Sequence, residues 1–226
     1  LAGMSEESSA HAEQFLREMG VNILLNKRVV DYRDHKVVLE DGTEIATRTF
    51  IWVSGVTGVT IGNLDASLIG RGGRIKVDSF NRVEGMNNVF AIGDQCIQVA
   101  DEDYPNGHPQ LAQVAIQQGE LLAKNLVRME KGREMKPFHY RNLGSMATVG
   151  RNRAVAEFSK VKMQGWFAWV MWLVVHLRSI LGVRNKVIVL LNWVWNYFTY
   201  DQSMRMIVYA RKAKEIRDRE KVEETT

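Results

Sequence analysis

The sequence contains one cysteine and three prolines among its 226 residues. A single thiol, Cys96, excludes an intrachain disulfide and a CxxC redox pair within these residues. The few prolines and a hydrophobic share of 46% indicate a globular chain that can bury a real core. Cys96 is therefore expected to be a small buried residue, and a reducing compartment is the default.

Concentrated charge is also lacking. The formal net charge is +4, and the Lys and Arg residues are spread along the chain rather than gathered in one basic region, so we expect no nucleic-acid partner. His108 and His139 have no metal-ligand spacing with other donors, so we expect no metal. Acidic residues are absent from residues 158–200, which form the most apolar and Trp-rich stretch.

Hydrophobic runs of membrane-spanning length are missing as well. Residues 166–175 give ten apolar residues before His176 and Arg178, and residues 187–198 give a second short run, whereas a span needs roughly 20. Both segments suit a membrane surface, where tryptophans and cations favour anionic lipid. The candidate surface residues are Trp166, Trp169, Trp172, Arg178, Arg184, Lys186, Trp193 and Trp195. The alternative is a helical hairpin that buries its tryptophans in a core or a dimer interface; the cations without an acid favour docking.

The remaining pattern mixes helices and strands, which predicts an α/β fold. Helical spacing covers residues 6–19 and 109–129, and Asp41-Gly42 is a hairpin turn signal. A charged tail covers residues 211–226 and is expected to be a solvated or frayed helix. The predicted strands are residues 21–25, 36–39, 43–46, 50–53, 74–77, 89–92, 145–149 and 154–158.

Gly93 and Asp94 follow the predicted strand 89–92, at the end where open α/β sheets bind ligands. Gly93 permits close backbone approach, and Asp94 offers an acceptor for a ribityl hydroxyl of a flavin. The helix beginning near Pro109 would turn its positive end toward the same ligand, beside the electron-rich edge of a flavin. An ordinary turn that ends a strand is an equally good interpretation from spacing alone.

Gln113 and Gln117 lie four residues apart, so they share one face of this helix. Two amides there would bind a quinone carbonyl or a flavin edge without bringing a charge into an apolar pocket. Two solvent-facing glutamines on an amphipathic helix remain the simpler interpretation. For His176, a satisfied histidine at a helix interface is favoured over a proton donor to quinone.

Five motifs together resemble one known family. FAIGDQC, AQVAIQQGE, GSMATVGRNRAVAEF, WFAWVMWLVVHL and GVRNKVIVLLNWVWNYFTYD are similar to the C-terminal half of type II NADH dehydrogenases, single-subunit flavoproteins with two dinucleotide-binding domains. The resemblance implies FAD binding by Asp94, with Gly93, Ala112 and Gln113 beside it. It implies flavin and quinone contacts for Gln113 and Gln117, and membrane docking for residues 166–198. Ser54 and Gly55, in the motif WVSG, are expected near the nicotinamide or flavin.

Two departures from the family matter. Neither GxGxxG fingerprint occurs, so the pyrophosphate cradles are absent from the sequence. Gln202-Ser203-Met204 replaces the usual Arg-Gly-Ala. We therefore expect the C-terminal part of a longer enzyme, inactive alone and without tightly held FAD. The expected parts are the end of an NADH domain (1–58), the end of an FAD domain (59–132) and a β-hairpin region with amphipathic helices (133–226).

The resemblance implies two-electron transfer from NADH through FAD to membrane quinone, without proton pumping. A peripheral homodimer on the cytoplasmic face of a bacterial inner membrane is expected. The alternatives are a sulfide:quinone or ferredoxin reductase, and a noncatalytic membrane-binding or dimerisation module. The single cysteine argues against the sulfide enzyme, and the aromatic C-terminal region argues against a soluble ferredoxin partner.

Overall fold

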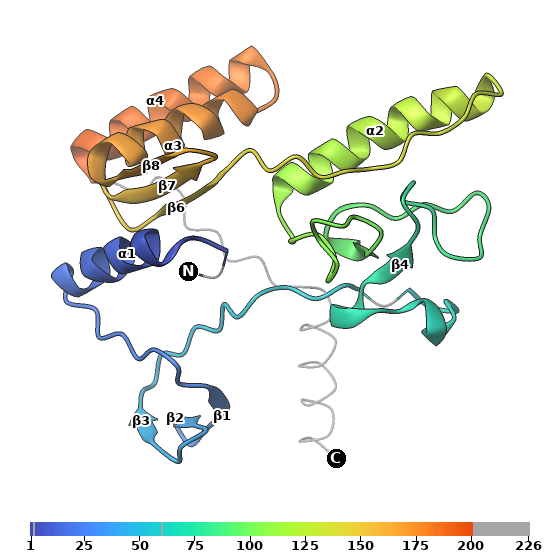
Figure 1. The fold of residues 1–226 in the computed structure, drawn as a ribbon. Helices are drawn as coiled ribbons and strands as arrows, with labels where there is room; N and C mark the ends of the chain where they lie inside the picture. Colours follow the sequence, from blue (N-terminus) through green and yellow to red (C-terminus); the bar gives the residue numbers. More distant parts are fainter. Residues whose placement is uncertain (2, 60, 201–226) are drawn as a thin grey trace, which may run out of the picture. The chain divides into compact units, whose positions relative to one another are not determined.

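The computed structural model describes residues 1, 3–59 and 61–200. The chain forms two units, Leu1–Met146 with Ala156–Lys162, and Ala147–Val155 with Met163–Thr226. The fold mixes helices with small sheets (Figure 1), as an α/β chain should. The expected charged tail and residues 202–204 lie outside the described residues.

Helix α1 (Glu6–Glu18) confirms the first predicted helix. Ser5 caps its start by accepting a hydrogen bond from the Ser8 backbone N–H, and two glutamates complement the positive end of the helix dipole. Glu157, on a later strand, accepts hydrogen bonds from the Ser5 backbone N–H (3.1 Å) and the Ser8 hydroxyl (2.6 Å). A long-range carboxylate thereby fixes the first turn of α1.

The first sheet is antiparallel, with the order β1 (Val29–Arg33), β2 (Lys36–Leu39) and β3 (Glu44–Ala46). The Asp41-Gly42 turn joins β2 to β3 as predicted, and Gly42 has the positive φ of +83° that a tight turn requires. Strand β1 was not predicted from the sequence, because its side chains are mostly exposed and show no clear apolar alternation.

Two predicted strands, residues 21–25 and 50–53, are wrong: neither forms a strand. Their apolar side chains remain largely exposed, including Ile51, Trp52 and Val53. An apolar run becomes a strand only when a neighbour satisfies its N–H and C=O groups. Among the described residues no strand pairs with either segment.

The second sheet is a parallel pair, β4 (Ile75–Val77) and β5 (Cys96–Gln98). Strand β4 confirms the predicted strand 74–77. The predicted strand 89–92 is wrong: only Phe90 forms an isolated bridge, to Arg82. The reason is burial, since all three residues of β5 are buried and pair with β4, whereas residues 89–91 close a local loop through Val83 and Asn81.

Helix α2 (Ala112–Glu130) confirms the second predicted helix but begins three residues after Pro109. The chain then returns alongside it (Figure 1). The third sheet has the order β6 (Ser145–Thr148), β7 (Ala154–Phe158) and β8 (Val161–Gln164). Its first two strands confirm the predicted hairpin, whose ends are joined by a hydrogen bond from Val149 N–H to Arg153 O (2.8 Å).

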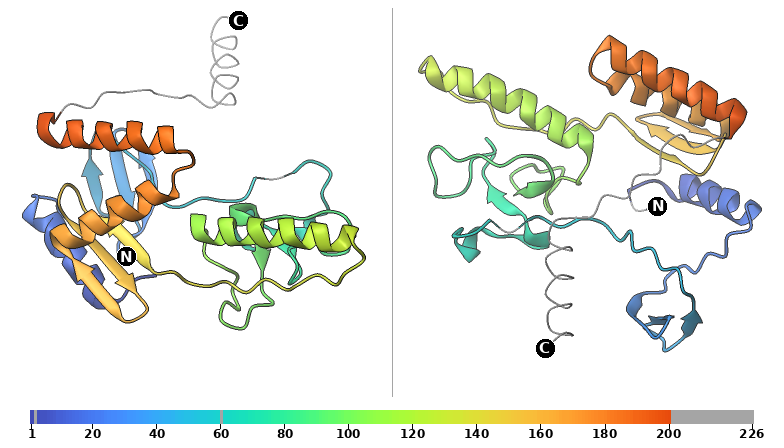
Figure 2. Two further views of the ribbon diagram at one scale, coloured as in Figure 1. Left: turned by 90° about the horizontal axis from the view of Figure 1, so that it is seen from above. Right: turned by 180° about the vertical axis from the view of Figure 1, so that it is seen from behind.

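Helices α3 (Gly165–Ser179) and α4 (Val183–Thr199) lie side by side as a hairpin (Figures 1 and 2). Because glycine commonly follows the last turn of a helix, the sequence predicts that Gly182 ends the first of them. Instead α3 ends at Ser179, and Gly182, with φ of +80°, immediately precedes α4. Of the helices in the described ranges, none has the length and apolar character needed to cross a bilayer.

Candidate functional site

The Gly93–Asp94 turn lies directly against α2. It forms a short 3-10 helix, Gly93–Gln95, with Gly93 at φ +65°. A Cβ at position 93 would lie 3.1 Å from the Ala115 Cβ, so a larger residue would crowd the helix in a backbone conformation that already favours glycine. The Gly93 N–H donates to the Gln118 Oε1 (2.7 Å), and Gln118 is only 1% exposed. The turn is thus fixed to the helix by a partly buried hydrogen bond.

The side chain of Asp94 and the start of α2 are both available to a ligand. Asp94 is exposed, and no described residue forms a hydrogen bond or ion pair with its carboxylate; its backbone O accepts from Gln110 Nε2 (3.2 Å). Leu111, the residue before α2, provides no side-chain cap. The first backbone N–H groups of α2, including that of Ala112, therefore meet no side-chain acceptor. An acceptor beside uncapped donors fits the ribityl hydroxyls and carbonyl edge of a flavin.

Gln113 and Gln117 face the returning chain. Gln113 donates to Gly144 O (3.0 Å) and accepts from Leu143 N–H (3.1 Å). Gln117 donates to Arg141 O (2.9 Å) and accepts from Arg141 N–H (3.1 Å). Both amides therefore act as substitute strand neighbours for residues 141–144, a role that sequence reasoning did not predict.

Asn125 repeats this arrangement two turns later. It donates to Lys136 O (2.8 Å) and accepts from Lys136 N–H (2.9 Å), and it is buried. Gln117 lies four residues after Gln113, and Asn125 lies eight residues after Gln117, so the three amides lie toward the same side of α2. That regular spacing is the sequence signal that could have revealed the returning segment.

Ser54 and Gly55 are exposed and lie in an irregular segment. Gly55 has φ of +89°, and its N–H donates to Val53 O (3.0 Å). Four residues later, Val59 donates its N–H to Gln95 Oε1 (2.9 Å) and accepts from Gln95 Nε2 (2.6 Å). Gln95 follows Asp94 in the turn, so one amide ties the segment after the WVSG motif to that turn.

Cys96 is buried, as expected. Burial raises the pKa of its thiol, and hydrogen bonds with Gln118 and Asn81 only partly offset this effect. Arg74 donates to Cys96 O (2.6 Å), and burial lowers the pKa of that guanidinium. A protonated, enclosed thiol is a packing residue rather than a nucleophile.

A buried acid and histidine precede α2, and the sequence analysis missed their pairing. His108 Nε2 lies 2.9 Å from Asp101 Oδ2, at 1% and 3% exposure. Burial alone would raise the pKa of Asp101, but hydrogen bonds from His108 and from the Tyr140 and Asp103 backbone N–H groups together lower it. Aromatic rings of Tyr104, Phe138 and Tyr140 surround the imidazole. The pair fixes the loop that leads to α2.

The aromatic residues of α3 and α4 divide into two groups. The ring centroids of Trp172 and Trp193 lie 6.2 Å apart, and those of Trp169 and Tyr197 lie 5.6 Å apart, so these rings pack against one another across the two helices. Trp166 and Trp195 are 51% and 61% exposed. The candidate cations are Arg178 and Arg184, both exposed, and Lys186, which is half-buried. The hairpin thus has an aromatic interior and an exposed surface bearing tryptophan and arginine.

His176 is exposed on α3 and stacks on Trp172, with ring centroids 3.9 Å apart. Its Nδ1 lies 2.7 Å from Trp172 O. A carbonyl oxygen only accepts, so Nδ1 carries the proton and Nε2 remains available to another partner.

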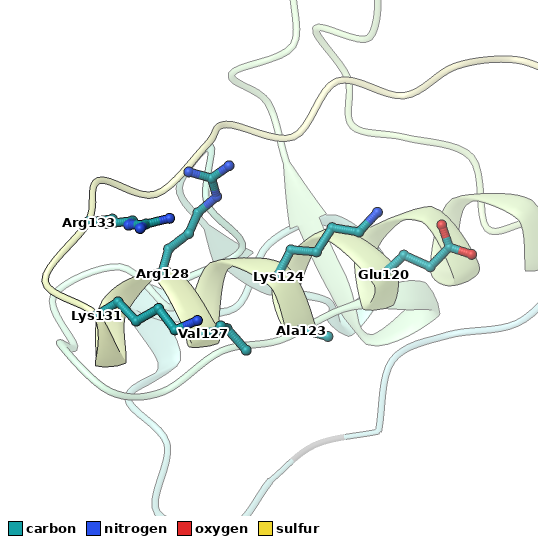
Figure 3. Close-up of a pocket in the computed structure, with 7 residues that line it drawn as sticks. All are labelled: Glu120, Ala123, Lys124, Val127, Arg128, Lys131 and Arg133. Carbon is teal, nitrogen blue, oxygen red and sulfur yellow. The ribbon is translucent and has the colours of Figure 1, made fainter.

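Two other observations bear on ligands. Within the described ranges no three His, Cys, Asp or Glu residues cluster as metal ligands. A hollow of about 750 Å³ lies along the C-terminal half of α2 (Figure 3), lined chiefly by Lys124, Arg128, Lys131 and Arg133. These cations complement the negative end of the helix dipole and are exposed or half-buried, so we interpret this hollow as part of a solvated helix end.

Comparison with known proteins supplies the family. Residues 1–119 match the model of the pyridine nucleotide-disulphide oxidoreductases, and residues 142–200 match the NDH2 C-terminal domain. The chain belongs to the pyridine nucleotide-disulphide oxidoreductases, as a type II NADH dehydrogenase sequence. The resemblance found in its motifs is thereby confirmed.

Two relatives of this type II NADH dehydrogenase sequence are named as quinone or ubiquinone oxidoreductases. It is 35% identical over 206 residues to the type II NADH:quinone oxidoreductase NdhA of Mycobacterium tuberculosis, covering 85% of this chain and 42% of that protein. It is 32% identical over 215 residues to the mitochondrial internal alternative NAD(P)H-ubiquinone oxidoreductase A1 of Arabidopsis thaliana, covering 87% and 42%. The chain therefore spans less than half the length of these relatives.

Solved structures share the fold. NDH2 from Plasmodium falciparum in complex with NADH matches with a TM-score of 0.77 at 17% identity, covering 89% of this chain and 56% of that one. The sulfide:quinone oxidoreductase of Aquifex aeolicus matches at 0.62 and 15% identity, covering 92% and 53%. Both reductases have this fold, so the fold alone does not choose between them.

Proposed function

We propose that the protein containing this chain transfers two electrons from NADH through FAD to membrane quinone, without pumping protons. The observation that carries the proposal is the free carboxylate of Asp94 beside the uncapped start of α2, with Gly93 fixed by Gln118. Relatives named for NADH and quinone support the substrates.

The residues present fit one part of FAD. Asp94 would accept a hydrogen bond from a ribityl hydroxyl, and the N–H groups of Ala112 and Gln113 would face the carbonyl edge of the flavin. Ser54 and Gly55 are proposed to lie near the nicotinamide or flavin. When bound, FAD supplies hydride acceptance and two-electron transfer; the protein positions it. The chain has no GxGxxG motif for a pyrophosphate, so tight FAD binding by this chain alone is not proposed, nor is activity.

For quinone, Gln113 and Gln117 are the proposed contacts on α2. Each amide uses one N–H and one oxygen lone pair on the backbone of residues 141–144, which leaves one of each for a ligand. His176 is separately proposed as a proton donor to quinone. With Nδ1–H donating to Trp172 O, the proton given to quinone would be the Nε2 proton of the imidazolium form.

We further propose a peripheral homodimer that docks on an anionic lipid surface through α3 and α4, at the cytoplasmic face of a bacterial inner membrane. Exposed Trp166, Trp195, Arg178 and Arg184 support docking. A sulfide:quinone reductase is less well supported, because Cys96 is buried and single. The domain limits near residues 58 and 132 remain part of this proposal.

Replacing Asp94 tests the flavin site in the full-length protein. Asp94→Ala removes a charge-assisted acceptor worth roughly 1.5–3 kcal/mol, so FAD affinity should fall about 10- to 150-fold. Flavin absorbance after dialysis measures retention, and NADH:quinone turnover is followed with and without added FAD. Glu102→Ala, at an exposed carboxylate of the next loop, is the control and should retain flavin. Full flavin retention by Asp94→Ala would show that Asp94 does not bind FAD.

A further inference from the structure

An apolar cavity of about 630 Å³ lies in the hairpin of α3 and α4. Side chains from both helices line it, with Gly150 and Arg151 from the β6–β7 turn. The apolar lining includes Trp169, Leu173, Leu190, Trp193 and Phe198. Its volume is that of a small-molecule site, which typically measures roughly 300–1,000 Å³.

Arg151 is the one charged residue among the lining side chains in the described ranges. Its guanidinium carbon lies 4.3 Å from the Tyr197 ring centroid and 3.9 Å from that of Tyr200, so two aromatic faces hold it in place. Neither helix carries an acidic residue, and none of the described residues forms a salt bridge with Arg151. A ligand that complements the positive charge of Arg151 in this cavity is therefore an anion.

Asn196 gives a second polar feature of the same cavity. Its carboxamide oxygen is buried and meets no donor among the described residues. A buried acceptor without a donor is unfavourable, so a rotation of the carboxamide that turns this oxygen toward the cavity would let a ligand hydroxyl satisfy it. The cavity therefore favours a molecule that combines an apolar chain, a negative charge and a hydroxyl donor.

We propose that this cavity binds a single anionic glycerophospholipid, with one acyl chain between α3 and α4, its phosphate on Arg151 and a headgroup hydroxyl on Asn196. The proposal rests on the membrane docking proposed above and adds a site of defined stoichiometry to a general surface attraction. Dispersed cations such as Arg178 would attract any anionic bilayer, whereas Arg151 would select one lipid molecule.

The test uses soluble lipids below their micelle concentrations. Dihexanoyl phosphatidylglycerol and dihexanoyl phosphatidylcholine are titrated into the full-length protein by calorimetry. We expect one site, with the anionic lipid at least about tenfold tighter. Both lipids carry a phosphate, but in phosphatidylcholine the choline cation neutralises that phosphate and the headgroup has no hydroxyl to donate to Asn196. Arg151→Gln should remove this preference, and Leu173→Trp should fill the cavity and weaken both lipids. Arg178→Gln removes a cation outside the cavity and should keep the one-site preference.

Several results would overturn the inference. These are absence of saturable binding, an unchanged preference in Arg151→Gln, loss of the preference in Arg178→Gln, or displacement of the lipid by a short-chain quinone, which would assign the cavity to quinone. Co-sedimentation with anionic vesicles separates the two proposals. Vesicle binding without a lipid site refutes only this inference, whereas loss of both refutes membrane docking as well.

Discussion

Gln118 offers the sharpest test of how the candidate flavin turn is held. Its side-chain oxygen accepts the Gly93 N–H at 2.7 Å, and its amide nitrogen lies 3.6 Å from the Cys96 sulfur. Gln118→Leu keeps a similar volume but leaves the Gly93 N–H without its acceptor. An unsatisfied donor in a buried setting costs about 1–3 kcal/mol, with the sulfur contact a minor addition.

Hydrogen exchange at the Gly93 amide measures this loss directly. Because 1.4 kcal/mol corresponds to a factor of ten, Gln118→Leu should reduce Gly93 protection roughly 5- to 150-fold. Glu120→Leu, an exposed position two residues along α2, should change it by less than about 0.5 kcal/mol. Gly93 protection that stays within twofold of the parent protein in Gln118→Leu would refute the reasoning, since the turn would then be fixed by other contacts.

Two further predictions concern the same region. The lowered pKa of Asp101 means that this carboxylate stabilises the fold above the ordinary aspartate pKa, and that the stabilisation is lost as the pH falls below about 4. Asp101→Asn should therefore flatten the acid side of a plot of unfolding free energy against pH. The control variant Asp103→Asn should leave that plot unchanged. Gly93→Ala should lower the free energy of unfolding by about 1–2 kcal/mol because of the positive φ at this position, and by a further amount because of the contact with Ala115. Gly132 has a φ of +63° and open space around it, so Gly132→Ala should show only the loss due to φ. Urea denaturation measures both.

The elements that could be predicted from the sequence are those with local causes. The Asp41-Gly42 turn, the hairpin of β6 and β7 and helix α2 follow from turn chemistry and helical spacing within each segment. Residues 21–25 and 50–53 carry equally apolar runs, yet they form no strand. Strand formation depends on a partner distant in sequence, and hydrophobicity alone does not specify one.

The candidate flavin site likewise combines features with local causes and features that depend on distant residues. Gly93 and Asp94 could be placed beside a helix start because an apolar run, a glycine turn and a helical pattern follow one another in the sequence. The strand itself was misplaced: β5 begins at Cys96, after the turn, so the turn precedes its strand and lies against α2. The pairing of Asp101 with His108 had no sequence signal beyond two polar residues in one loop.

The three glutamines of α2 show where helical periodicity stops being informative. Gln117 and Gln118 are adjacent, so they point about 100° apart: Gln117 faces residues 141–144, and Gln118 faces Gly93. Periodicity correctly placed Gln113 and Gln117 on one face, but it did not say whether backbone, solvent or ligand lies there. Backbone occupies half of their hydrogen-bonding capacity, so a quinone contact requires only the remaining N–H and lone pair. Substituting either glutamine would consequently disturb residues 141–144 as well as any bound quinone. A role in quinone binding is isolated only if the KM for quinone changes while the Leu143 and Arg141 amides keep their protection from hydrogen exchange.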